Sequence, residues 1–160
     1  MSIYIFSRPI HSGKTTELMQ WCSKQKNIYG VLMPDINGSR KILDLHSKNV
    51  FDIECTVSVH TDEPLTIIGS FRFYTASFDK ANQIILDAIA QNPYWLVIDE
   101  AGKLEIDGKG LYPSILKAVE FYKNNSGNLL ITVRESLLVE VISYFNLDGC
   151  KLIHQLGSGI

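Results

Sequence analysis

The feature that most constrains the fold is an alternation of short apolar runs with longer segments of helical periodicity. Runs of strand length occupy residues 2–6 (SIYIF), 29–34 (YGVLMP), 94–100 (YWLVIDE) and 128–133 (NLLITV). Because these runs are nearly continuously apolar, they predict strands buried on both faces of a sheet. A sheet buried on both faces needs helices on both sides, so the order predicts an α/β fold with a mainly parallel sheet and right-handed crossovers.

The segments between these runs predict the remaining elements. Helices are expected at 13–26, from Ser77 as N-cap up to Pro93, and at 111–123 and 135–145, with a last strand at 150–156. Asn37-Gly38 is a strong hairpin signal. With a further strand expected within 48–59, it predicts an antiparallel meander inserted into the sheet. Residues 60–76 show no clear periodicity and are expected to form a long surface connection.

Composition narrows the class of protein. The 160 residues suit one domain over 1–160, and 46% hydrophobic with 20% charged residues is a globular balance. A net charge of −2 gives no sign of nucleic-acid or membrane binding. Three widely spaced cysteines argue against a disulfide framework or a structural zinc site, and no signal peptide or membrane span is evident. We therefore expect a cytoplasmic protein. Whether it has a protein partner is not evident from the sequence.

The loop after the first predicted strand carries the clearest chemical motif. Residues 8–15, RPIHSGKT, match the phosphate-loop template G-x-x-x-x-G-K-[ST] (Walker A) at every fixed position except the first. In that template, backbone N–H groups cradle phosphates at a helix N-terminus. We expect Lys14 to reach the β- and γ-phosphates and the Thr15 hydroxyl to bind Mg²⁺. The predicted nucleotide-binding residues are Arg8, Pro9, Ile10, His11, Ser12, Gly13, Lys14, Thr15 and Thr16.

A second half of such a site follows the apolar run WLVI. Asp99 has the position of the magnesium-associated acid (Walker B), and Glu100 that of the residue that activates the attacking water. Because ligands of parallel α/β sheets bind at the carboxyl ends of the strands, both acids are expected near the phosphate loop. No N-K-x-D motif follows, which argues against a guanine-specific switch.

For several other residues, the sequence does not decide between a role in the active site and a place on the surface. Lys103 and Glu105 are either active-site residues or ordinary solvated charges, and His11 either contacts phosphate or faces solvent. Arg134 follows the NLLITV strand, where it is either an arginine that neutralises γ-phosphate charge or a surface residue. The remaining histidines (His46, His60 and His154) show no metal-ligand spacing, and Trp21 and Trp95 are expected in the core.

With both halves placed, the chain resembles the small P-loop nucleoside-triphosphatase family that includes the human cancer-related enzyme. The segment YWLVIDEAGKLEI is similar to that family's D-E-I-G-K-M-E-L signature, and the segments at 29–55 and 69–89 resemble its hairpin region and its next helix. The resemblance implies a three-layer P-loop fold and Mg²⁺-dependent hydrolysis of nucleoside 5′-triphosphates, with broad base tolerance and slow turnover. The family loop usually reads G-P-P-G-V-G-K-T, so Arg8 and His11 replace two of its glycines.

Two alternatives remain from the sequence. SGKTTEL and IDEA also resemble type II thymidine kinases, but the zinc-binding cysteine pairs of that family are absent here. The other alternative is a nucleotide-binding module that no longer hydrolyses, which Arg8 and His11 favour and the intact Lys14, Thr15, Asp99 and Glu100 oppose.

Overall fold

The computed structural model describes residues 2–56, 59–157 and 160. Within them, eight strands form one sheet in the order β10-β1-β9-β8-β2-β4-β3, with β5 paired to β4. The strands are β1 (Ser2–Arg8), β2 (Ile28–Leu32), β3 (Asp35–Ile36), β4 (Ser39–Asp44), β5 (Val50–Asp52), β8 (Trp95–Ala101), β9 (Asn128–Arg134) and β10 (Lys151–Ile153). From β10 to β2 every pairing is parallel. The predicted mainly parallel α/β sheet is therefore confirmed.

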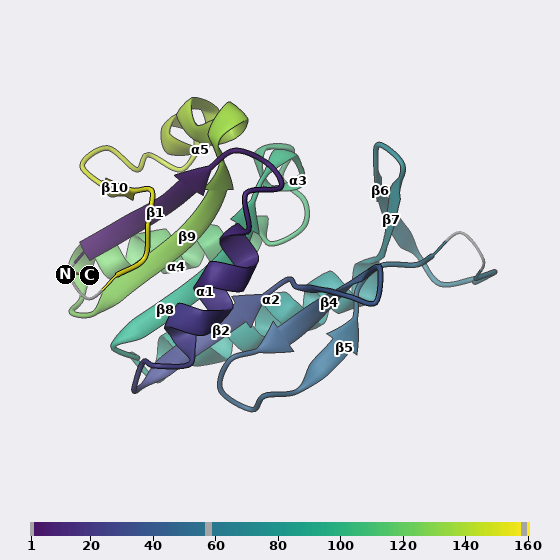
Figure 1. Ribbon diagram of the computed structural model, residues 1–160, viewed down its shortest axis with the longest axis horizontal. Coiled ribbons are helices and arrows are strands. Elements are labelled where there is room, and N and C mark those ends of the chain that lie inside the picture. Colours follow the sequence, from purple (N-terminus) through teal and green to yellow (C-terminus); the bar gives the residue numbers. More distant parts are fainter. Residues whose placement is uncertain (1, 57–58, 158–159) are drawn as a thin grey trace.

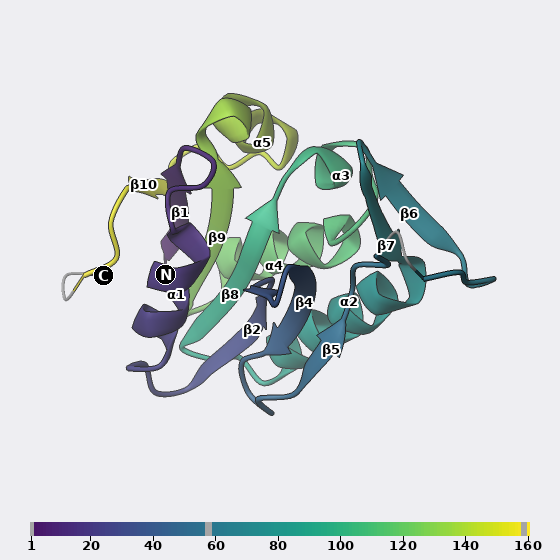
Figure 2. The same cartoon turned by 45° about the vertical axis from the view of Figure 1, so that its right-hand side comes forward.

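Helices cover both faces of this sheet, as Figures 1 and 2 show. Helix α1 lies on one face, while α2 and α4 lie on the other. The helices are α1 (Lys14–Cys22), α2 (Thr75–Ala90), α3 (Lys103–Ile106), α4 (Tyr112–Asn124) and α5 (Leu138–Tyr144), the last preceded by a 3₁₀ turn, η1 (Glu135–Leu137). None of the helices in this described part of the chain is long and apolar enough to cross a membrane.

Two clusters of buried apolar side chains hold the sheet between its two layers of helices. Under α1, Leu18 and Trp21 pack with strand residues such as Phe6 and Trp95. A larger cluster on the opposite face joins α2 and α4 to the other side of the same strands. Trp21 and Trp95 are 7% and 3% exposed, which confirms their expected core positions.

The antiparallel insertion follows the prediction only in part. The Asn37-Gly38 hairpin is confirmed, since Asp35 pairs with Arg40 across it. The strand expected within 48–59 is only the short β5, and residues 57–58 lie outside the described residues.

The prediction of an irregular connection at 60–76 is wrong. Strands β6 (Leu65–Ile68) and β7 (Phe71–Tyr74) form a separate two-stranded hairpin, which projects from the body of the molecule in Figure 1. Gly69-Ser70 makes its turn, and Gly69 has a φ of 56° that suits glycine.

The start of helix α2 and the end of helix α1 also differ from the predictions. Helix α2 begins at Thr75, and the Ser77 hydroxyl donates to the carbonyl of Asp52 at 2.7 Å rather than capping the helix. Helix α1 ends at Cys22, four residues before the predicted end at Lys26. After it, the N–H groups of Lys24 and Gln25 donate to carbonyls three residues back, as in a turn.

Candidate nucleotide site

The phosphate loop has the predicted context, with strand β1 before it and helix α1 after it. Strand β1 ends at Arg8 and α1 begins at Lys14. Two loop residues adopt left-handed backbone, His11 with a φ of 57° and Gly13 with a φ of 77°. Gly13 stands directly before the helix, so the first N–H groups of α1 open toward the loop.

Arg8, the departure from the template, does not disturb the bend. It is the last residue of β1, is paired with Arg134 of β9, and has no positive φ, so no glycine is required there. Its guanidinium forms an ion pair with Glu17 of α1 at 2.7 Å and lies 5.2 Å from the Phe6 ring centroid. The Arg8 side chain therefore braces strand against helix instead of entering the loop.

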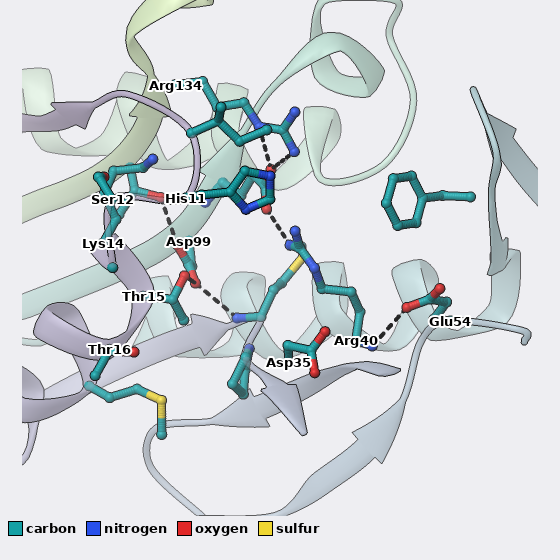
Figure 3. A pocket seen from close by; sticks show the side chains of 18 of the residues that line it. His11, Ser12, Lys14, Thr15, Thr16, Asp35, Arg40, Glu54, Asp99 and Arg134 are labelled. Carbon is teal, nitrogen blue, oxygen red and sulfur yellow. Dashed lines mark hydrogen bonds and ion pairs between the residues drawn. The ribbon is translucent and has the colours of Figure 1, made fainter. Parts of the chain in front are cut away.

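A cavity of about 500 Å³ opens over the loop and the strand ends (Figure 3). Seven consecutive loop and helix residues from Ile10 to Thr16 line it, whereas Arg8 and Pro9 do not. The opposite wall consists of Met33, Pro34, Asp35, Gly38, Arg40, Glu54, Phe71, Asp99, Glu100, Thr132 and Arg134, with Met19 beside the loop. The predicted loop and the predicted acids thus share one cavity.

Lys14 is held by the loop itself. Its Nζ donates to the carbonyls of Arg8 and Pro9 at 3.2 and 3.1 Å. Burial lowers the pKa of Lys14, while the nearby carboxylates of Glu100 and Asp99 act in the opposite direction. An ammonium group carries three donors, so one N–H is left for an anion in the cavity.

Asp99 is a fully buried carboxylate with neutral donors around it. Thr132 Oγ1 donates to its Oδ1 at 2.6 Å, while Thr15 Oγ1 and the Met33 N–H each lie 3.1 Å from its Oδ2. Burial raises the pKa of Asp99 despite these three hydrogen bonds. No lysine or arginine of the described chain forms an ion pair with it.

This environment fits a divalent cation. A buried carboxylate is normally paired with a positive charge or a metal, and Mg²⁺ prefers hard oxygen ligands such as the Thr15 hydroxyl and Asp99. Within the described residues, no cluster of three or more His, Cys, Asp or Glu side chains forms a protein-only metal cage. The available oxygens match a cation that would share its coordination shell with phosphates and water.

Glu100 sits at a strained point of the sheet. Its φ is 69°, and the β8–β9 register shifts between Ile98 and Ala101. A non-glycine residue in this conformation costs on the order of 1–3 kcal/mol, and such strain concentrates at functional sites. The bulge turns the Glu100 side chain into the cavity beside Asp99.

Two arginines hold the Glu100 carboxylate. Arg40 Nη1 lies 2.5 Å from Oε2, and Arg134 Nε and Nη2 lie 2.9 and 2.5 Å from Oε1. In Figure 3, Arg40 and Arg134 reach toward each other from opposite sides of the cavity. Although burial alone would raise the pKa of Glu100, the two guanidinium charges hold it below its usual value.

Arg134 lines the cavity and contacts Glu100, so it lies at the candidate site. Sequence reasoning missed Arg40 and Thr132. Arg40 lies in the antiparallel insertion, where no motif marks it. Thr132 lies inside the apolar run LLITV, where its hydroxyl also accepts the Glu100 N–H at 2.7 Å.

Glu105 has a structural role. Its carboxylate accepts the backbone N–H groups of Gly102 at 2.8 Å and Leu111 at 3.0 Å, and its side chain is buried. It therefore fastens the turn around α3 and does not line the 500 Å³ cavity. Lys103 is exposed and lines a neighbouring pocket of about 110 Å³, which Glu100 and Glu105 also line.

The four histidines do not lie together in one site. His11 is exposed but lines the 500 Å³ cavity. His46 stacks on Tyr29 with centroids 4.2 Å apart, and His154 Nδ1 lies 2.8 Å from the carbonyl of Ser7. His60 is exposed in the loop before β6.

Comparisons with known proteins support the fold. No protein-family model matches the chain, and no curated protein matches it. Among solved structures, THEP1 from the hyperthermophile Aquifex aeolicus superposes with a TM-score of 0.71 and 18% identity, over 96% of this chain and 89% of that one. A human cancer-related nucleoside triphosphatase gives a TM-score of 0.64 and 17% identity, over 99% of this chain and 89% of that one.

At such identities the likeness shows the fold alone. The chain therefore shares the α/β fold of these two proteins, as the resemblance implied.

Proposed function

We propose that the protein hydrolyses nucleoside 5′-triphosphates to the diphosphate and inorganic phosphate. The observation that carries this proposal is the convergence of Lys14, Thr15, Asp99 and Glu100 on one cavity at the strand ends. Phosphoryl transfer depends mainly on positioning and on electrostatic stabilisation, and these residue types supply both. One of the two structural neighbours is named a nucleoside triphosphatase, which agrees with the proposal.

The loop residues bind the triphosphate in this proposal. Backbone N–H groups from Ile10 to Thr15 face the β- and γ-phosphates, and the free donor of Lys14 adds charge between them. Thr15 and Asp99 are the residues that would hold Mg²⁺, Asp99 through its water shell. When bound, that ion neutralises phosphate charge and lowers the barrier to departure of the diphosphate.

Glu100 orients and deprotonates the attacking water. The water oxygen forms a bond to the γ-phosphorus while the bond to the β–γ bridging oxygen breaks. The diphosphate takes the electron pair of that bond, and the water proton passes to Glu100. Arg134 offsets the charge on the γ-phosphate oxygens. Since the sequence holds no N-K-x-D motif for guanine, broad base tolerance is part of the proposal.

Phosphate release from ATP, GTP, CTP and UTP, with and without Mg²⁺, tests this function. Lys14→Ala is expected to abolish turnover, and Glu100→Gln to lower it by roughly 10² or more while nucleotide still binds. A Lys14→Ala protein that hydrolyses at the wild-type rate would rule out this site.

One observation favours a second function, a nucleotide-binding module without hydrolysis. Both Glu100 oxygens are occupied by arginines, and a carboxylate held in two ion pairs is a weak base. Binding of all four triphosphates without phosphate release would support this function. Thymidine-dependent formation of ADP would instead support the kinase alternative.

A further inference from the structure

The pairing of two arginines with one carboxylate leaves one net positive charge on these three side chains. Arg40 and Arg134 carry two charges, and Glu100 neutralises one of them. All three side chains are partly exposed, at 28%, 34% and 25%, so the group lies open to the cavity. Asp35, Glu54 and Asp99 also line the cavity, so this positive charge is local to the two guanidinium groups. It favours an anion that contacts the guanidinium groups directly.

The two guanidinium groups also have unused donors. Each guanidinium has five N–H donors. Arg40 uses one nitrogen, Nη1, on Glu100, and Arg134 uses Nε and Nη2. Their remaining donors are available to a second oxyanion. Planar guanidinium groups are well suited to phosphate oxygens.

Arg40 is well positioned although it comes from the antiparallel insertion. Its backbone N–H donates to Glu54 Oε2 at 2.8 Å, and β4 pairs with β2, which lies beside the acid strand β8. The next residue, Lys41, pairs with Asp52 instead and does not line the cavity. The two adjacent cations therefore serve different partners, which makes Lys41 a matched control.

We propose that Arg40 is a γ-phosphate-binding residue and that it acts with Arg134 as a sensor of the third phosphate. Without a triphosphate, both arginines rest on Glu100. The γ-phosphate draws their donors away, and this exchange frees Glu100 oxygens to face the attacking water. After hydrolysis and release of phosphate, the arginines return to Glu100, and the diphosphate lacks their contacts. The proposal rests on the function proposed above and adds a residue from outside the two P-loop motifs.

Binding measurements on the full chain separate this proposal from the function itself. Calorimetric titration with Mg²⁺ and either the β,γ-imido analogue of ATP or ADP gives the ratio of triphosphate to diphosphate affinity without any hydrolysis. Arg40→Gln is expected to weaken binding of the analogue by about tenfold or more, the range of one or two charge-assisted hydrogen bonds. Its affinity for ADP should stay within about twofold, and Lys41→Gln should change neither affinity.

Glu100→Gln provides an opposite test. Because it removes the competitor for both arginines, the affinity for the analogue should rise relative to ADP. Arg40→Lys, which keeps the charge but loses the planar donors, should give a ratio between those of the wild type and Arg40→Gln.

Equal losses of ADP and analogue affinity in Arg40→Gln would overturn the sensor role, as would an unchanged ratio. A Glu100→Gln ratio equal to or below that of the wild type would overturn the exchange. If the wild type binds neither nucleotide, the proposed function itself has failed, and with it this inference. Thermal unfolding of each variant identifies a misfolded protein, in which case the Arg40→Lys ratio decides.

Discussion

We expect Thr132→Val to lower the free energy of unfolding far more than the small change in side-chain volume suggests. Thr132 is 1% exposed, and the substitution keeps the shape of its side chain but removes the hydroxyl. That hydroxyl makes two hydrogen bonds, one to Asp99 and one from the Glu100 N–H. A hydrogen bond to a charged group contributes about 1.5–3 kcal/mol and a neutral one about 0.5–1.5 kcal/mol. We therefore expect the free energy of unfolding to fall by about 2–4 kcal/mol.

Equilibrium urea unfolding measures this loss, and Thr132→Ser is the control. The serine variant keeps the hydroxyl and loses one buried methyl group, which costs about 1 kcal/mol. If valine destabilises the protein no more than serine does, the hydroxyl does not hold Asp99 and Glu100 in place. Because Glu100 has a strained φ of 69°, the valine variant should also lose turnover if hydrolysis is established.

Further predictions concern positions around the site and in the core. His11→Gly removes the strain of a side chain at a φ of 57°, but glycine also makes the unfolded chain more flexible. The free energy of unfolding measured in urea should therefore rise by only about 0.5 kcal/mol. A fall of more than about 1 kcal/mol would contradict the strain argument. Glu105→Gln places an amide N–H against one of two backbone donors; its unfolding free energy should drop by about 1–3 kcal/mol, and an unchanged value would refute the structural role. Iodoacetamide at pH 8 should label the half-buried Cys150 before Cys22, because burial raises the pKa of the Cys22 thiol to about 12 and leaves little thiolate. Peptide mapping that finds Cys22 modified as fast as in urea would contradict its burial.

Much of the parallel sheet could be predicted because burial on both faces leaves a strong trace in the sequence. The runs at β1, β8 and β9 are apolar almost throughout, and helices of distinct periodicity separate them. The β6–β7 hairpin was missed because its two strands form a sheet of their own and are only partly buried, so hydrophobic alternation is weak there. Its Gly69-Ser70 turn between two apolar runs was the available signal.

Some residues of the candidate site could likewise be predicted from the sequence, and others could not. Lys14, Thr15, Asp99 and Glu100 belong to local motifs whose chemistry can be recognised in a few consecutive residues. Arg40 reaches the site through tertiary pairing of β4 with β2, which nothing in its immediate sequence indicates. Arg8 shows the opposite case, since its departure from the template matters little once its place at the end of β1 is known.

The order of strands also has a consequence for how the protein folds. Strand β1, which carries the phosphate loop, pairs only with β9 and β10 within the described residues, and Ser2 lies opposite Asn128. Contacts between residues so distant in the chain form slowly, because a long loop must close before they contribute. During synthesis, β1 leaves the ribosome well before β9 and β10, and its apolar side chains stay exposed until these partners follow. The loop that would hold phosphate is thus expected to be among the last parts of the molecule to reach its native shape.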